Sequence, residues 1–119
     1  MKPLTIKKLT ALIVDALEEM KAYNILVLDV STLTTITDVM IIASGRSNRQ
    51  VKSIAEKVQE KLSEAGVATL GMEGEQEAEW ILVDVGDVVV HIMQPATRTY
   101  YQLEKLWDVD NVATDTSSL

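Results

Sequence analysis

The sequence contains no cysteine, no phenylalanine and only one histidine in its 119 residues. Without cysteine, disulfide bonds and thiolate metal ligands are excluded. Every apolar run is shorter than the ~20 residues that span a lipid bilayer. Residues 1–5 also lack the apolar segment and cleavage site of a signal peptide. We therefore expect a cytoplasmic protein without a membrane segment.

Cationic side chains are scarce as well. Eleven Lys and Arg residues stand against 18 Asp and Glu residues, and the formal net charge is −7. Nucleic-acid phosphates attract clustered Lys and Arg side chains, so this composition argues against direct binding to DNA. A basic protein surface is the better electrostatic match. Acidity also keeps a protein soluble without any partner, and charge alone does not separate these two interpretations.

The remaining composition suits one domain. Of the residues, 47% are hydrophobic, and the core is expected to be aliphatic because the aromatic side chains are limited to Trp80, Trp107, Tyr23, Tyr100 and Tyr101. Residues 1–107 are predicted to form this domain. Residues 108–119 are polar and lack periodicity, which predicts a disordered tail.

Three segments carry apolar side chains at helical spacing. The first covers residues 5–22. The second begins with a capping box formed by Ser47 and Gln50, and it ends before Gly66. The third follows Gln94 and Pro95 and covers residues 96–107. Within this third helix, Tyr100, Leu103 and Trp107 are predicted to share the side that packs, and Arg98, Tyr101 and Lys105 the opposite side.

Short apolar runs between these segments predict strands. Residues 24–30 read as a buried strand, residues 38–43 as a second strand and residues 67–70 as a short third one. Residues 31–37 and 71–79 are predicted to be loops. The order of elements predicts an α/β fold with a mixed β-sheet of about five strands flanked by helices.

Residues 80–93 carry the pattern of a β-hairpin. Gly86 can supply the positive φ that a type II′ turn needs at its first central position. With this turn, one face of the hairpin is entirely aliphatic and must be buried: Ile81, Val83, Val85, Val88, Val90 and Ile92. The opposite face mixes large apolar and polar side chains, which suits a covered or a docking surface: Trp80, Leu82, Asp84, Val89, His91 and Met93.

Two groups of titratable side chains are candidates for a catalytic or metal-binding role. His91 lies diagonal to Asp84 on the predicted hairpin, as a general base oriented by a carboxylate would. No Ser or Cys motif supplies a nucleophile, so a structural or binding pair is the alternative. Asp38, Asp84 and Asp87 are candidate metal ligands, but Asp84 and Asp87 diverge across a tight turn. We therefore expect no catalytic residue, no metal and no cofactor.

Arg98 and Tyr101 are typical of interface anchors, because an exposed Tyr beside an Arg occurs often at binding hot spots. An exposed Tyr lying along its own helix is the alternative interpretation.

Several blocks of the sequence together resemble the ribosomal silencing factor family, RsfS, also called Iojap. They cover most of residues 9–107. The matching blocks are Thr37-Asp38-Val-Met-Ile-Ile-Ala-Ser-Gly45, Arg49-Gln50-Val51, Gly71-Met-Glu73-Gly74, the hairpin from Trp80 to His91, and Arg98-x-x-Tyr101-x-Leu103-Glu104-x-Leu106-Trp107.

The resemblance implies a nucleotidyltransferase-like α/β fold without that fold's catalytic carboxylates. It implies binding to the large ribosomal subunit through a protein of the L-fourteen family, which blocks joining of the small subunit and lowers translation when nutrients are limiting. It also implies a possible homodimer. The alternative function is a small metal-dependent nucleotidyltransferase using Asp38 or Asp84.

The docking surface is expected on the mixed face of the hairpin and the adjoining helix. Its predicted partner-binding residues are Trp80, Asp84, His91, Met93, Arg98 and Tyr101.

Overall fold

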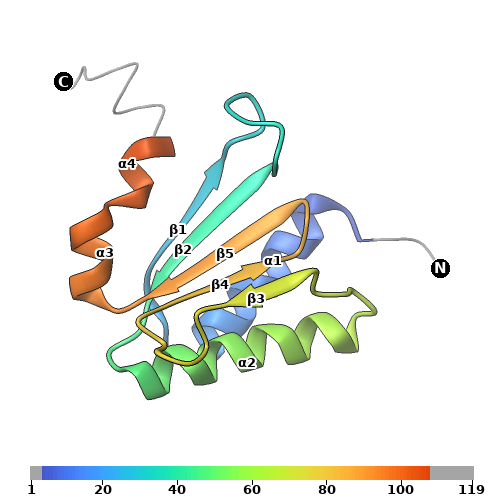
Figure 1. Ribbon diagram of the computed structural model, residues 1–119. Coiled ribbons are helices and arrows are strands. Elements are labelled where there is room, and N and C mark those ends of the chain that lie inside the picture. Colours follow the sequence, from blue (N-terminus) through green and yellow to red (C-terminus); the bar gives the residue numbers. More distant parts are fainter. Residues whose placement is uncertain (1–3, 108–119) are drawn as a thin grey trace.

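The computed structural model describes residues 4–107 and shows a five-stranded sheet with helices on it (Figure 1). The predicted tail at residues 108–119 and the side chain of Trp107 lie outside what the structure describes. The elements in chain order are α1 (Ile6–Glu19), β1 (Tyr23–Asp29), β2 (Val39–Ser44), α2 (Asn48–Glu64), β3 (Gly71–Glu73), β4 (Trp80–Asp84), β5 (Val88–Met93), α3 (Pro95–Tyr101) and α4 (Leu103–Trp107).

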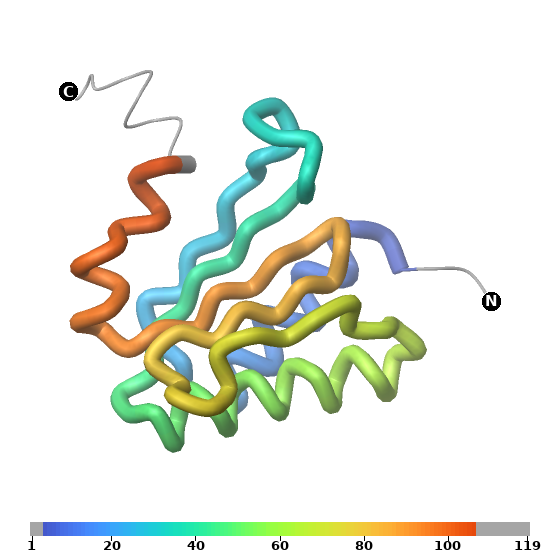
Figure 2. Tube along the Cα trace, viewed as in Figure 1, coloured from blue at the N-terminus to red at the C-terminus, as the bar shows by residue number. Residues whose placement is uncertain are grey.

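The strands lie in the order β1-β2-β5-β4-β3. β2 and β5 are parallel, and the other three neighbouring pairs are antiparallel. The chain of β5 therefore lies between β2 and β4, at the centre of the sheet (Figure 2). The predicted α/β fold with a mixed five-stranded sheet is confirmed.

Helices α1 and α2 pack on one face of the sheet. The Thr5 hydroxyl oxygen accepts the Lys8 N–H at 3.1 Å, and the Ser47 hydroxyl oxygen accepts the Gln50 N–H at 3.1 Å, so both helices begin with a side-chain cap. Their apolar stripes meet the sheet in a first core cluster that includes Ile13, Leu17, Ile54, Val58 and Leu62. The two predicted helices are confirmed, and Gly66 follows α2 with a φ of 78°.

Gln50 ties the two helices together. Its side-chain carbonyl oxygen accepts the Arg46 N–H at 2.6 Å, and its amide donates to the carbonyl oxygens of Met20 and Lys21 at 3.4 and 3.3 Å. One side chain thus satisfies backbone groups at the start of α2 and at the end of α1.

The hairpin of β4 and β5 has the predicted register. Ile81 lies opposite Ile92, and the Val85 N–H donates to the Val88 carbonyl at 2.9 Å. Gly86 has a φ of 93°, as the turn requires. The predicted aliphatic face is buried against α1 and α2 in the first core cluster.

Three local predictions are wrong. β1 is an edge strand and not a buried one, and Val27 is 44% exposed. The third strand covers Gly71–Glu73, at the start of the predicted loop, because these residues pair with Asp84–Leu82 of β4. The third helix breaks at Gln102, which has a φ of 49° and a ψ of 51° and separates α3 from α4.

Candidate partner-binding surface

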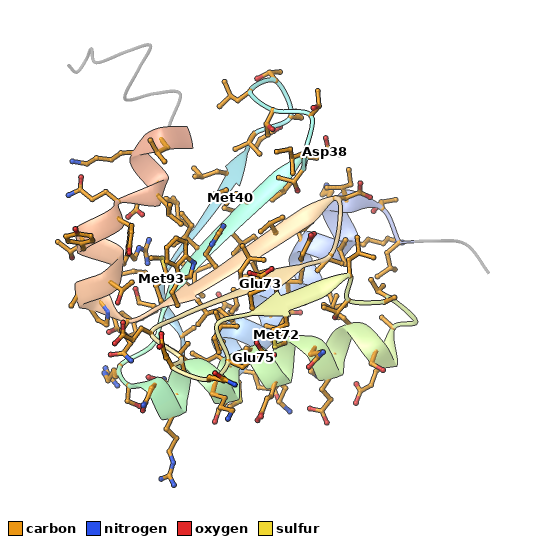
Figure 3. The ribbon with its side chains drawn as sticks, in the orientation of Figure 1. Asp38, Met40, Met72, Glu73, Glu75 and Met93 are labelled. Atoms are coloured by element: carbon orange, nitrogen blue, oxygen red, sulfur yellow. The ribbon has the colours of Figure 1, made fainter. Side chains whose placement is uncertain are left out.

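The second face of the sheet carries a smaller core cluster, and α3 and α4 lie on this side, beside β1 (Figure 1). Its buried members are Val30, Met40, Ile42 and Met93, and partly buried side chains of Leu28, Trp80 and Leu103 pack against them. Met40 and Met93 come from the neighbouring strands β2 and β5 (Figure 3). Trp80 lies at the border of this cluster, where the covered part of the face gives way to solvent.

Trp80 is held by two aromatic neighbours. Its indole N–H donates to Nδ1 of His91 at 2.9 Å, and the two ring centroids lie 5.7 Å apart. The ring of Tyr101 lies 4.9 Å from that of Trp80 in a tilted arrangement, and Tyr100 packs edge-on against Tyr101. Tyr101 is 51% exposed and Tyr100 is 80% exposed. The aromatic row therefore runs from a buried His to an exposed Tyr.

His91 is a neutral acceptor in this arrangement. It is buried, and this burial lowers its pKa from 6.5 to about 4 because a charged imidazolium loses its hydration. Since Nδ1 accepts the indole N–H of Trp80, the remaining ring proton belongs on Nε2. His91 orients the indole from beneath.

Asp84 does not pair with His91. It lies on the same face, but its Oδ1 accepts the Gly86 N–H at 2.9 Å and so supports the hairpin turn. The diagonal arrangement of Asp84 and His91 agrees with the predicted register, and their hydrogen bonds go to other residues. The geometry of a base oriented by this carboxylate is not formed.

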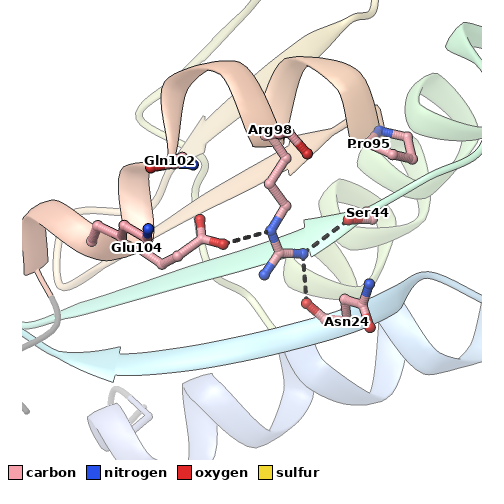
Figure 4. Close-up of a pocket in the computed structure, with 8 residues that line it drawn as sticks. Asn24, Ser44, Pro95, Arg98, Gln102 and Glu104 are labelled. Carbon is pink, nitrogen blue, oxygen red and sulfur yellow. Dashed lines mark hydrogen bonds and ion pairs between the residues drawn. The ribbon is translucent and has the colours of Figure 1, made fainter. Parts of the chain in front are cut away.

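Arg98 points toward the sheet, contrary to the prediction. Its side chain is only 12% exposed, and its Nη1 donates to the Asn24 carbonyl at 2.6 Å and to the Ser44 hydroxyl at 2.9 Å (Figure 4). Its Nε lies 3.2 Å from Oε2 of Glu104. Tyr100, which was predicted to pack, is exposed instead. The break at Gln102 separates Tyr100 from Leu103 and Trp107, with which it was predicted to share a packing side.

A cavity of about 390 Å³ lies between these helices and the end of the sheet. Its lining residues include those labelled in Figure 4: Asn24, Ser44, Pro95, Arg98, Gln102 and Glu104. Glu104 was not among the predicted site residues. Its position six residues after Arg98 gives no helical signal, because the two side chains meet only after the chain turns at Gln102.

The six predicted site residues divide into two groups. Trp80, Asp84 and Tyr101 retain exposed surface on or beside the second face. His91 keeps 6% of its surface and Met93 keeps none, so neither offers area to a partner in this arrangement. The Arg98 side chain, at 12% exposure, is also largely covered.

Gly74, which was not among the predicted site residues, lies against the backbone of Trp80. A Cβ on this residue would lie 2.0 Å from the Trp80 carbonyl oxygen, and its φ is 93°. The loop between β3 and β4 can therefore pass against the Trp80 backbone only with glycine at this position.

Acidic side chains do not gather into a metal site in the part of the chain that the structure describes. Asp38 and Asp87 are joined through the backbone, where the Asp38 N–H donates to the Asp87 carbonyl at 3.0 Å. Within residues 4–107, no group of three or more His, Cys, Asp or Glu side chains is arranged to hold a metal ion. The helices among these residues also lack the length and apolar character needed to cross a membrane.

Known proteins with similar sequence and structure share this fold. A sequence model of the family described as "Ribosomal silencing factor during starvation", RsfS, matches residues 3–119. Ribosomal silencing factor RsfS of Chromobacterium violaceum is 53% identical over 102 residues, which cover 86% of this chain and 84% of that protein. A Mus musculus protein named "Mitochondrial assembly of ribosomal large subunit protein 1" is 33% identical over 99 residues, which cover 81% of this chain and 43% of the mouse protein.

A solved crystal structure of a Chromobacterium violaceum protein superposes with a TM-score of 0.87. It is 51% identical to this chain, and the match covers 88% of each chain. Because the family match spans residues 3–119 and the fold agrees with that of a closely similar protein, this chain belongs to the ribosomal silencing factor family, RsfS.

Proposed function

We propose that this protein binds the large ribosomal subunit through a protein of the L-fourteen family and sterically blocks joining of the small subunit. Translation would then fall when nutrients are limiting. Membership of the silencing factor family supports this proposal, and so does the mouse relative, whose name refers to the ribosomal large subunit. The net charge of −7 also suits a basic ribosomal protein better than naked RNA.

The observation that carries the proposal is the Trp80–Tyr101 pair. Two large aromatic side chains lie in contact at the edge of a core cluster, and Tyr101 still exposes 51% of its surface. Aromatic anchors of this kind dominate many protein interfaces. We propose that Trp80 and Tyr101 are the anchors, with Asp84 at the rim and His91, Met93 and Arg98 beneath them.

The role we propose is binding without catalysis, by a cytoplasmic protein that forms a homodimer when it is free. Asp84 supports a turn and His91 accepts the Trp80 indole N–H, so both side chains already have structural tasks. The alternative, a metal-dependent nucleotidyltransferase using Asp38 or Asp84, requires converging carboxylates that residues 4–107 do not provide. Stabilisation by a nucleotide with Mg²⁺ would favour that alternative.

Sedimentation with purified subunits tests the proposal. The wild-type protein should pellet with large subunits but not with small ones, and an excess should slow formation of whole ribosomes measured by light scattering. Tyr101→Ala should weaken large-subunit binding about thirtyfold, since a truncated aromatic anchor costs about 2 kcal/mol. Its melting temperature should change little, because Tyr101 is half exposed.

Controls separate the surface from the fold. Tyr101→Phe keeps the ring and should bind nearly as well as the wild type. Glu56→Gln on the exposed side of α2 removes one negative charge on the opposite face and should bind normally. Preferential sedimentation with the small subunit would refute the proposed function. If Trp80→Ala unfolds the domain while Tyr101→Ala binds normally, the proposed surface is wrong.

A further inference from the structure

The two carboxy-terminal helices cannot hold their position by themselves. α3 has seven residues and α4 has five, whereas isolated helices shorter than ~12–15 residues are marginal in water. None of the seven residues of α3 is buried, and Gln94 provides no side-chain cap at its start. The placement of these helices therefore depends on a few contacts with the sheet.

Arg98 makes the most extensive polar contact between α3 and the rest of the domain. Its guanidinium reaches three elements: the Asn24 carbonyl on β1, the Ser44 hydroxyl on β2 and the Glu104 carboxylate on α4. Ser44 is 1% exposed, so Arg98 donates here to a nearly buried hydroxyl. A planar guanidinium can serve several acceptors at fixed angles, which a Lys ammonium cannot reproduce.

Glu104 depends on Arg98 in turn. Its Oε2 accepts a hydrogen bond from the Arg98 Nε–H at 3.2 Å. Its Oε1 is buried without a hydrogen-bond partner among the described residues. Removing Arg98 would leave the whole carboxylate unpaired, which is costly for a partly buried charge. The pair thus joins α3 to α4 across the left-handed residue Gln102.

The two residues that flank Gln102 link this pair to the proposed docking surface. Tyr101 precedes it and packs on Trp80, and Leu103 follows it and packs on the second core cluster. We propose that Arg98 and Glu104 form a positioning pair that keeps Tyr101 on Trp80, and that Arg98 supports binding through these rings without touching the partner. This inference rests on the proposed function for the identity of the partner.

The position of the pair separates it from the main core. The first core cluster lies on the opposite face of the sheet and contains residues of α1, α2 and the strands, but none of α3 or α4. Loss of the pair should therefore release the two short helices while the sheet stays folded.

The test combines binding with a measurement on the free protein. Arg98→Ala and Glu104→Ala should each weaken large-subunit binding about tenfold or more, as loss of an anchor's support does. In the free protein, both should shift the Trp80 indole N–H resonance and speed amide hydrogen exchange in α4. The thermal midpoint should remain close to that of the wild type. The Trp107→Phe variant keeps only the Trp80 indole, so it distinguishes the indole N–H resonances of the two Trp residues.

Two comparisons make the test specific to positioning. Arg98→Lys should not restore binding, whereas Lys105→Ala, which removes a charge from an exposed residue of α4, should bind within about twofold of the wild type. In a Tyr101→Ala background, adding Arg98→Ala should weaken large-subunit binding only slightly further. Substitutions of residues that act through one another have non-additive effects.

Several results would overturn the inference. Weaker binding of Arg98→Ala with an unchanged indole resonance and unchanged exchange would identify Arg98 as a direct contact. Opposite effects of Arg98→Ala and Glu104→Ala on affinity would indicate a charge contact with the partner. Unfolding of the whole domain by either variant would make the pair a purely structural one. If the wild type fails to bind large subunits, the proposed function fails, and the free-protein measurements still decide whether the pair positions Tyr101.

Discussion

At the scale of single residues, the hydrogen bond between Trp80 and His91 joins two aromatic side chains on the second sheet face. The indole N–H and the imidazole Nδ1 satisfy each other at 2.9 Å beside the apolar side chains of Ile42 and Leu82, which flank His91 on the neighbouring strands. Burial of polar groups is tolerated when each has a partner. The pair therefore allows an aromatic side chain to be both firmly placed and partly exposed.

This burial predicts that acid destabilises the protein between pH 6.5 and about 4. The pKa of His91 is about 4 in the folded protein against 6.5 in an open chain, so the unfolded state binds more protons in this interval. The contribution of His91 to the free energy of unfolding is then fully present above pH 6.5 and decreases as the pH falls toward 4. At ~1.4 kcal/mol per pKa unit, the loss is about 3 kcal/mol, measurable by urea unfolding at pH 7 and pH 4.

His91→Gln is the control for this prediction. A Gln side chain can still accept the Trp80 indole N–H but does not titrate. The variant should lose much less stability than the wild type between pH 6.5 and 4. An equal loss in both proteins would show that another group causes the acid sensitivity. The exposed Asp29, whose pKa is lowered by its hydrogen bonds to Ser31, titrates below this interval.

At the scale of elements, Gly74 constrains the loop between β3 and β4. Gly74 combines a positive φ with a close approach to the Trp80 carbonyl, and its own carbonyl accepts the Ala78 N–H at 2.8 Å. This loop leads directly into Trp80. Its conformation therefore contributes to the placement of the indole.

Gly74→Ala is expected to lower the free energy of unfolding by more than ~1–2 kcal/mol. The left-handed conformation alone costs a non-glycine residue about that much, and the added Cβ would collide with backbone. Chemical unfolding measures the loss, and large-subunit affinity should fall because Trp80 must move.

Gly71→Ala is the matched substitution in the same segment. A Cβ at Gly71 would meet nothing within 4 Å, so the free energy of unfolding should change by no more than ~0.5 kcal/mol. Equal effects of the two substitutions would contradict the assigned role of Gly74.

At the scale of the whole molecule, the sheet separates two layers of different size. One face carries the large core with α1 and α2, and the other carries a small core with α3 and α4 (Figure 1). The first layer supplies most of the buried apolar side chains. The second can therefore present partly exposed aromatic side chains without losing the fold.

The net charge of −7 predicts that association with a basic partner is sensitive to salt. Raising ionic strength shortens the Debye length to ~10 Å at 0.1 M and weakens long-range attraction. The association rate with large subunits should therefore fall as NaCl increases, while the dissociation rate changes less. Stopped-flow measurements between low and moderate salt provide both rates.

Asp84→Asn should reduce this salt dependence more than Glu56→Gln does. Both substitutions remove one negative charge, but only Asp84 lies on the proposed surface, and Glu56 lies on α2. An association rate that does not change with salt would show that electrostatic attraction plays no part in the encounter.

The sequence by itself determined the features that depend on near neighbours in the chain. Helices α1 and α2 follow from 3.6-residue periodicity and, for α2, from its capping box. The β4–β5 register follows from Gly86 and the alternation of side chains. These signals act within a few residues, so no knowledge of distant segments is needed. The aliphatic face of the hairpin was predictable for the same reason.

Only the tertiary structure decided which segments cover the second face. The edge position of β1 and the pairing of Gly71–Glu73 with β4 depend on contacts between distant segments. Within α3, Arg98 reaches inward to β1 and β2 while Tyr100 is exposed. Alternation in a strand shows which side chains share a face, but the packing of remote helices decides how much of that face remains open.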